Sequence, residues 1–361
     1  VRCGMPYDAI NLHQKLKECR VIHGTAHTFV ALLKACSQVK DLERGSEIHA
    51  MIEKDGSLVG NLFVGNTLIN MYIKCGSADK AQDVFDKLPF RNVVSWTTVI
   101  AGYVTCGHAE KALYCYENMQ LEGVSPDAIT FIFGFQACNG IGSIDKGQEI
   151  HSQLVKRGFF ETNVAVGNSL VDMYAKCGLV AEATRVFKSL PVKDVVCWTS
   201  LITGYAEHGY GDEACKSFAE MQHRGIQPNA FTFVGILKAC VSSTRAVQKG
   251  CEMHAEIEKK GLLDENIILG NALIDMYCQC GFVEEAEHLF SSLRIKDIVS
   301  WNVLIAGYAE HEQGQEAMEC FEMMHLEGAQ PSATTFVSML KVCGSMQAAN
   351  KGQELHAVIA R

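Results

Sequence analysis

Three stretches of this sequence are close copies of one another: SWTTVIAGY at 95–103, CWTSLITGY at 197–205 and SWNVLIAGY at 300–308. Their tryptophans lie 102 and 103 residues apart. In the first copy the apolar side chains have helical spacing, and a glycine-containing turn, CGHAEK from Cys106, leads to a second amphipathic run, ALYCYENMQLEG. This long period predicts an array of helix-turn-helix units.

Two other segments recur in the same phase, so each long period holds three related units. The first is FVGNTLINMYIKCG at 63–76, AVGNSLVDMYAKCG at 165–178 and ILGNALIDMYCQCG at 268–281. The second is TFVALLKAC at 28–36, TFIFGFQAC at 130–138, TFVGILKAC at 232–240 and TFVSMLKVC at 335–343. Recurrence of their cysteines and Met-Tyr pairs at the repeat period indicates packing between units and not catalysis.

One pair of short helices cannot bury its apolar stripe, so neighbouring pairs must stack. A chain that is 48% hydrophobic and 20% charged has the composition of a folded protein. These observations predict an all-α solenoid with a concave inner face.

Composition and motifs exclude several other classes. No apolar run reaches the roughly 18 to 20 residues of a membrane span, and the first residues, VRCGMPYDAI, lack the order of a signal peptide. The 16 cysteines are spread along the chain without a C-x-x-C, and Cys278 and Cys280 have the wrong spacing for a zinc knuckle. We expect buried, reduced thiols and no membrane association, metal, cofactor or small-molecule substrate.

The repeated segments closely resemble the plant pentatricopeptide repeat family, in the variant where standard, long and short repeats alternate. The resemblance implies a right-handed superhelical solenoid and a single array over 1–361. We place short repeats at 62–92, 164–194 and 267–297, and standard repeats at 93–127, 195–229 and 298–332. Long repeats lie at 26–61, 128–163 and 230–266, with partial repeats at 1–25 and 333–361. We therefore expect a fragment of a longer protein.

In this family each repeat binds one base of single-stranded RNA. By resemblance, the fifth residue of the first helix and the last residue of the repeat contact the base edge. In the short and standard repeats these pairs are Asn66 with Asn92, Thr97 with Asp127, Asn168 with Asp194, Thr199 with Asn229, Asn271 with Asp297, and Asn302 with Ser332. The long repeats have Val30, Ile132, Val234 and Val337 at the fifth position, so we expect weak discrimination there.

Side-chain size and polarity then suggest the bases. Asparagine reaches a small pyrimidine, whereas threonine leaves room for a purine. An Asp carboxylate only accepts hydrogen bonds, which suits the ring N–H of U or G, while Asn or Ser can donate to C or A. With RNA running 5′ to 3′ along the chain, the predicted target is N-Y-G-N-U-A-N-U-C-N.

The second residue of each repeat wedges between bases in this family. Apolar residues suited to this role are Phe63, Val94, Val196, Ile268 and Val299, whereas Ala165 is small. The alternative for the last residues of the repeats is purely structural, because Asn and Asp also cap helices well.

The repeat alternation resembles that of organellar RNA-editing factors, whose C-terminal deaminase domain converts C to U. We therefore expect location in mitochondria or chloroplasts and accessory editing proteins as partners. The chain itself is not expected to be an enzyme. His254-Ala255-Glu256 matches the opening of a zinc deaminase signature, but the later P-C-x-x-C is missing and the histidine recurs at other repeats.

A formal charge of −9 conflicts with nucleic-acid binding, which usually depends on Lys and Arg. It would better suit the alternative function, a protein-interaction scaffold of the tetratricopeptide type. The W-x-x-L-G-x-x-Y pattern of that family is absent, however.

Overall fold

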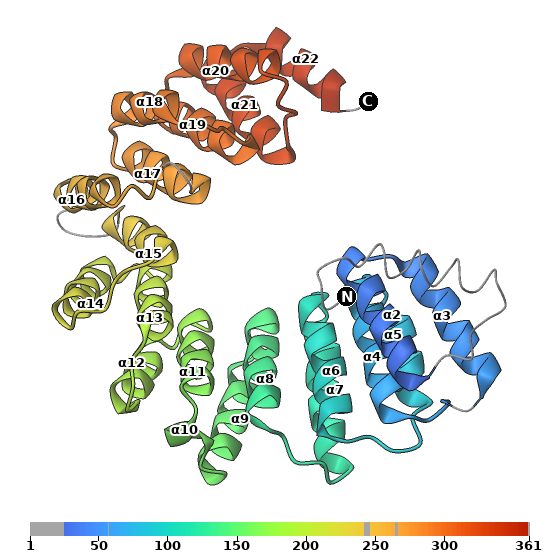
Figure 1. Ribbon diagram of the computed structural model, residues 1–361. Helices are drawn as coiled ribbons and strands as arrows, with labels where there is room; N and C mark the ends of the chain where they lie inside the picture. Colours follow the sequence, from blue (N-terminus) through green and yellow to red (C-terminus); the bar gives the residue numbers. More distant parts are fainter. Residues whose placement is uncertain (1–24, 57, 242–245, 264–265, 360–361) are drawn as a thin grey trace. The chain divides into compact units, whose positions relative to one another are not determined.

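The computed structural model describes residues 25–56, 58–241, 246–263 and 266–359, and within these ranges every regular element is helical (Figure 1). The all-α prediction is therefore confirmed. Most of the predicted partial repeat at 1–25 lies outside the described residues.

The chain divides into two compact units, Val1–Cys177 and Gly178–Arg361. The division falls at the turn of the predicted short repeat 164–194, so the single array stays a prediction. Each unit is a stack of helical hairpins, in which a first and a second helix alternate along the chain.

In the first unit, the first helices of successive repeats pack side by side in chain order. They are α2 (Ala26–Val39), α4 (Leu62–Lys74), α6 (Val93–Thr105), α8 (Ala128–Ile141) and α11 (Val164–Lys176). The second helices are α3 (Leu42–Asp55), α5 (Ala78–Asp86), α7 (Ala109–Leu121) and α9 (Ile144–Lys156), and the short α10 (Phe159–Thr162) follows α9.

The second unit has the same layering. Its first helices α13 (Val195–Glu207), α15 (Ala230–Val241), α17 (Ile267–Gln279), α19 (Ile298–Glu310) and α21 (Ala333–Ser345) pack in chain order. Its second helices are α12 (Val180–Ser189), α14 (Gly211–His223), α16 (Ala246–Lys259), α18 (Val283–Ser292), α20 (Gly314–Leu326) and α22 (Ala349–Ile359). Every first helix in both units begins at the residue where a repeat is expected to begin.

The turns between the helices of short and standard repeats depend on glycine. Gly76 has φ of 77° and Gly281 has φ of 84°, a region in which a side chain would be strained. Each lies directly after the cysteine that ends the first helix, which accounts for the recurring Cys-Gly pair.

The tryptophans that mark the period form the joint between short and standard repeats. Trp96 on α6 packs edge-on against Phe85 on α5, with ring centroids 4.7 Å apart. The equivalent pairs, Phe187 with Trp198 and Phe290 with Trp301, lie at 4.6 and 4.7 Å. Short and standard repeats are thus joined by the same aromatic contact in every period.

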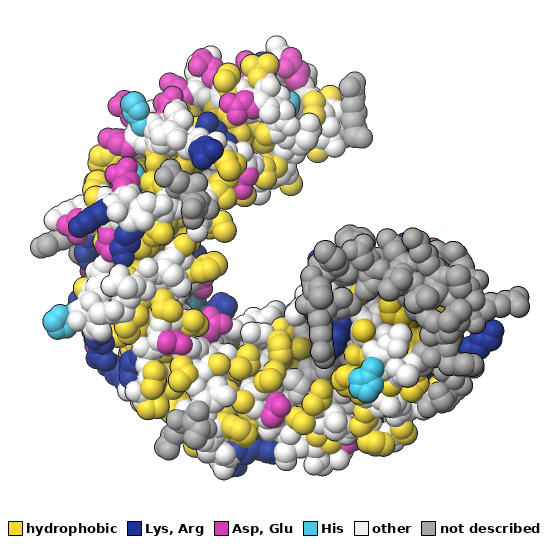
Figure 2. Space-filling view, viewed as in Figure 1, with side chains coloured by type: hydrophobic (Ala, Val, Ile, Leu, Met, Phe, Trp, Pro, Cys, Tyr) yellow, Lys and Arg dark blue, Asp and Glu magenta, His cyan; other side chains and the backbone are white. Residues whose placement is uncertain are grey.

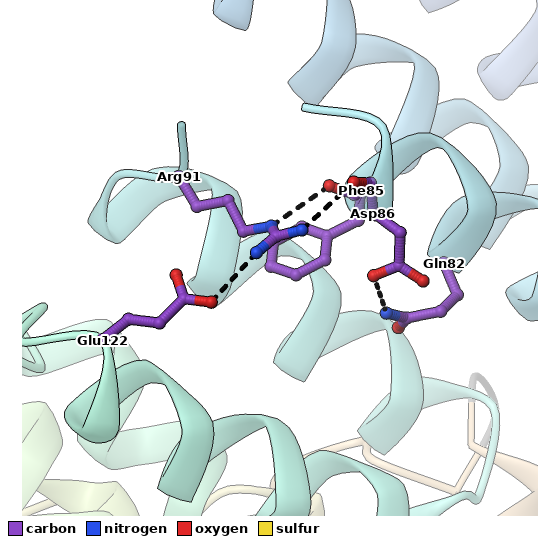
Figure 3. Close-up of polar contacts among 5 residues, drawn as sticks. All are labelled: Gln82, Phe85, Asp86, Arg91 and Glu122. Atoms are coloured by element: carbon purple, nitrogen blue, oxygen red, sulfur yellow. Dashed lines mark hydrogen bonds and ion pairs between the residues drawn. The ribbon is translucent and has the colours of Figure 1, made fainter. Parts of the chain in front are cut away.

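Arg91 reinforces this joint in the first unit (Figure 3). Its guanidinium lies 4.8 Å from the centroid of Phe85 and donates to the backbone carbonyls of Phe85 and Asp86 at 3.2 and 3.1 Å. A third bond, 2.9 Å long, reaches Glu122 at the end of α7. One half-buried side chain therefore connects a short repeat to the standard repeat that follows it.

The recurring histidines of the long repeats have a packing role. Nδ1 of His254 lies 2.8 Å from the hydroxyl of Tyr277, and His49 and Tyr72 make the same contact at 2.9 Å. The histidine of the motif that resembles a deaminase opening therefore forms a hydrogen bond between a long repeat and the next short repeat.

Candidate nucleic-acid interface

The last residues of the predicted repeats are the N-caps of the following first helices. Oδ1 of Asn92 accepts from the backbone N–H of Ser95 at 3.0 Å, and Oδ1 of Asp194 accepts from that of Cys197 at 2.9 Å. The same cap occurs at Asp127, Asn229, Asp297 and Ser332. The structural alternative is thus correct as geometry, and it explains why every first helix begins where it does.

Capping leaves part of each side chain for other contacts. Oδ1 of Asn92 faces the first turn of α6 and accepts the cap bond, so Nδ2 of the same amide is turned away from that helix. Asn92 and Asn229 are exposed, while Asp127, Asp297 and Ser332 are half-buried. These side chains are reachable from solvent at the first turn of each helix.

In two repeats the predicted pair is in direct contact. Nδ2 of Asn271 donates to Oδ1 of Asp297 at 3.2 Å, and Nδ2 of Asn302 donates to Oγ of Ser332 at 3.1 Å. The fifth and last residues therefore lie together although 26 and 30 residues separate them.

In two other repeats a buried threonine of the next first helix joins the pair. Thr97 bonds Thr130 at 2.7 Å, and Thr130 donates to Asp127 at 2.8 Å. Likewise Thr199 bonds Thr232 at 2.7 Å, and Thr232 donates to Asn229 at 3.0 Å. Both pairs are brought together, but through a third residue that we did not anticipate.

The pair of the short repeat 62–92 is not joined in this way. Asn66 and Asn92 each lie at their expected place, on α4 and at the cap of α6, without a bond between them in the structure. Asn168 and Asp194 fall in different compact units, so only their own surroundings are described. Asn168 is buried on α11, and Asp194 caps α13.

Asn66 and Asn271, in two of the short repeats, have buried amide oxygens whose surroundings are unfavourable for folding. Oδ1 of Asn66 and Oδ1 of Asn271 are buried and have no hydrogen-bond partner among the described residues. An unmade bond of this kind costs about 1–3 kcal/mol. Proteins accept such costs at functional positions.

Asp297 is ionised at neutral pH. Burial alone would raise its pKa, but hydrogen bonds from Ser300 and Asn271 lower the pKa below the usual value for a carboxyl. The carboxylate can therefore only accept hydrogen bonds, as the predicted reading requires.

The second residues of the repeats are exposed apolar side chains beside these pairs. Their exposed fractions are 53% for Phe63, 53% for Val94, 51% for Val196, 57% for Ile268 and 48% for Val299. Ile129 and Phe231 hold the same position in long repeats and are also exposed. Sequence reasoning missed these two because it considered only short and standard repeats, although the repeat register would have identified them.

Charge is divided unequally between the two sets of helices. The first helices carry five lysines, Lys34, Lys74, Lys176, Lys238 and Lys341, against four carboxylates, Asp172, Glu207, Asp275 and Glu310. Acidic residues outnumber Lys and Arg in the second helices α3, α5, α7, α14, α16, α18 and α20. Figure 2 shows the carboxylates gathered over the region of α18 and α20. The acidic charge of the chain thus lies mainly away from the helices that carry the predicted reading pairs.

The described cysteines are free thiols, and several are deeply buried. Burial raises the pKa of Cys138 and of Cys278 to about 12, so both stay protonated and are poor nucleophiles or metal ligands. Among the described residues no group of three or more His, Cys, Asp or Glu is placed to hold a metal ion. Within the same residues, no helix has the length and apolar character needed to cross a membrane.

Comparison with known proteins places these repeats in a family. The PPR repeat family profile matches residues 91–139, 193–242 and 296–345, and a PPR repeat profile matches 66–93, 168–195 and 271–298. A chloroplastic pentatricopeptide repeat-containing protein of Arabidopsis thaliana is 36% identical over 89% of this chain and 51% of its own length. A mitochondrial one from the same plant is 35% identical over 94% and 55%. The chain thus spans about half the length of these relatives.

The fold has a close counterpart among solved structures. The crystal structure of the pentatricopeptide repeat protein PPR10, in complex with an 18-nt psaJ RNA element, matches 98% of this chain and 58% of its own with a TM-score of 0.73. Its sequence identity of 16% makes this a likeness of fold alone. Together, the matched profiles and the stacked hairpins show that this chain belongs to the pentatricopeptide repeat family.

Proposed function

We propose that the chain binds single-stranded RNA and reads one base per short or standard repeat. The observation that carries the proposal is the pairing of fifth and last residues, direct in Asn271–Asp297 and Asn302–Ser332 and through threonine in two other repeats. Chain segments about 30 residues apart are brought together to present two polar groups beside an exposed apolar side chain. An unpaired base needs both kinds of contact, one for its edge and one for its face.

The distribution of charge is compatible with this role. The first helices carry five lysines and four carboxylates, and their N-caps add Asp127, Asp194 and Asp297, so the negative excess along them is small compared with that of the whole chain. The acidic second helices confine RNA to the first helices. This division reduces the conflict between the formal charge of −9 and RNA binding.

The reading pairs give the target N-Y-G-N-U-A-N-U-C-N, with the long repeats unspecific. The alternation of short, standard and long repeats further supports a role as the recognition part of an organellar C-to-U editing factor, in which another part of the protein performs the chemistry. The organellar relatives support a mitochondrial or chloroplast location. Accessory editing proteins are the expected partners besides RNA.

Selection from a pool of random RNA tests the proposal. Sequences bound by the purified chain are expected to be enriched in the predicted motif, with pyrimidines opposite Asn271 and Asn302 and purines opposite Thr97 and Thr199. Enrichment of purines opposite Asn168 and Asn271 contradicts the assigned pairs, and the absence of any enriched RNA contradicts RNA binding.

A further inference from the structure

We infer that a buried hydroxyl at the third position of a first helix is a positioning residue for the reading pair of the preceding short or standard repeat. These residues are Ser95, Thr130, Thr232, Ser300 and Thr335, and all five are fully buried. The inference rests on the proposed function, because it concerns how the same pairs present their polar atoms to a base.

Thr130 fixes the direction of a hydrogen-bond chain. Its hydroxyl lies 2.8 Å from Oδ1 of Asp127, which cannot donate, so the single proton of Thr130 points to the carboxylate. The 2.7 Å bond between Thr97 and Thr130 must then be donated by Thr97. Thr97 is left with lone pairs only, and the pair offers acceptors to a base.

Thr232 holds the amide of Asn229. Oδ1 of Asn229 accepts from the backbone N–H of Thr232 at 2.9 Å and from its hydroxyl at 3.0 Å. The hydroxyl proton of Thr232 is shared with Thr199, which donates its own proton to the carbonyl of Val195 at 2.7 Å. The amide of Asn229 cannot turn over without losing the backbone bond to Oδ1, so Nδ2 points away from the cap. Asn229 therefore presents a donor where Asp127 presents an acceptor, which is the distinction the proposed reading of A and G depends on.

Thr335 acts on a fifth residue. Its hydroxyl donates to Oδ1 of Asn302, and Nδ2 of Asn302 then faces Ser332. Ser300 completes the series, since its hydroxyl donates to Oδ1 of Asp297 at 3.0 Å. In each case the third residue forms a hydrogen bond to one polar atom of the reading pair, which leaves the other polar atoms of the pair for a base.

The residue types at the third position support the same role. A hydroxyl or thiol occupies the third position after all six repeats whose fifth residue is polar, the thiol being Cys197. After the three complete long repeats, with Val30, Ile132 and Val234 at the fifth position, the third residue is apolar: Val64, Val166 and Leu269. A buried hydroxyl thus follows a repeat only where there is a polar pair to orient.

The test is Thr130→Val, which keeps the shape and removes the hydroxyl. Binding is measured by fluorescence anisotropy on four RNAs that differ only in the base opposite Thr97 and Asp127. The wild-type chain is expected to prefer G, and the variant to lose about five- to tenfold of the G-over-A ratio, as for one lost hydrogen bond. Thr130→Ser should restore the preference, because it restores the hydroxyl.

The matched control is Thr98→Val on α6, whose hydroxyl donates to the carbonyl of Val94 within the same helix. It should leave the ratio unchanged. Thr232→Val is measured in parallel at the A position, in the other compact unit, in case Thr130→Val does not fold. A wild-type chain without base preference contradicts the proposed function. A preference that survives in folded Thr130→Val or Thr232→Val overturns the positioning role alone.

Discussion

Asn271 on α17 donates a hydrogen bond of 3.2 Å to Asp297, the N-cap of α19. The same Oδ1 accepts from the backbone N–H and the hydroxyl of Ser300. A single carboxylate therefore begins a helix and contacts the polar residue of the preceding repeat. Helix capping and base reading are compatible here, because the cap bonds and the Asn271 bond all fall on Oδ1.

Replacing Asp297 with Asn should change base preference and not affinity in general. The carboxylate accepts from the N3–H of U, whereas an amide whose Oδ1 caps the helix offers a donor to C. We expect the U-over-C ratio at this position to fall about tenfold or more in anisotropy measurements.

The control for this change is Asp41→Asn. Asp41 also caps a helix through Oδ1, at 3.0 Å from the N–H of Arg44, but it begins the second helix α3. Its substitution should leave every base ratio as in the wild type. An unchanged U preference in Asp297→Asn contradicts the assignment of this residue as a reader.

Phe63→Ala should weaken RNA binding without changing selectivity. Phe63 is 53% exposed at the second position of its repeat, where a ring can stack on a base. Stacking on an aromatic side chain contributes about 1–3 kcal/mol per base, so we expect affinity to drop about tenfold.

Phe90→Ala provides the comparison, since Phe90 is 63% exposed but follows the second helix α5. Its loss should not affect RNA affinity measured by the same titration. Equal effects of the two substitutions would show that exposed aromatic rings act non-specifically.

Arg91→Ala should destabilise the first unit. The guanidinium donates to two backbone carbonyls and to Glu122 and packs on Phe85 (Figure 3), so its removal loses three hydrogen bonds and a ring contact. We expect a loss of about 2 kcal/mol in the free energy of unfolding, measured by urea denaturation. Arg185→Ala, which removes an exposed side chain paired with Glu182 one turn away, should cost less than about 0.5 kcal/mol.

Stability should fall in mildly acidic solution because of two half-buried histidines. Burial lowers the pKa of His254 and of His49 from the ordinary 6.5, despite a nearby glutamate in each case. The unfolded chain then binds protons more readily than the folded one. The contribution of the neutral histidines to the free energy of unfolding is fully present above pH 6.5. It is lost as the pH falls from 6.5 toward the lower folded-state pKa.

The free energy of unfolding measured at about pH 7.5 and about pH 5.5 checks this. His254→Gln should reduce the difference between the two values, whereas His108→Gln, at an exposed residue, should not. A pH dependence that persists undiminished in His254→Gln would rule out this histidine as its source.

Much of the fold can be predicted from the sequence because the same pattern of apolar and capping residues recurs in every repeat. The copies around Trp96, Trp198 and Trp301 determine the period, and Asn92 or Asp127 before an apolar run indicates a helix start. The resemblance predicts the fifth and last residues, and among the five pairs that lie within one compact unit four are in contact, directly or through threonine.

The hydroxyl network could not be anticipated in the same way. Thr130 and Thr232 lie in strongly apolar runs, AITFIFGF and AFTFVGIL, where a threonine looks like an ordinary core residue. Their partners are 33 residues earlier in the chain, and hydrogen-bond direction depends on geometry that periodicity does not specify. The capping box formed by Asp127 and Thr130 was the available signal, since the three-residue spacing recurs after each polar repeat.

The most direct test is a binding titration with a ten-nucleotide RNA of the predicted sequence N-Y-G-N-U-A-N-U-C-N. The comparison RNA exchanges purine and pyrimidine at every specified base. We predict tight binding to the first, weakened by added salt, and binding to the second weaker by a factor of about 100 or more. Equal binding of the two RNAs, or none to either, would contradict base reading by these repeats.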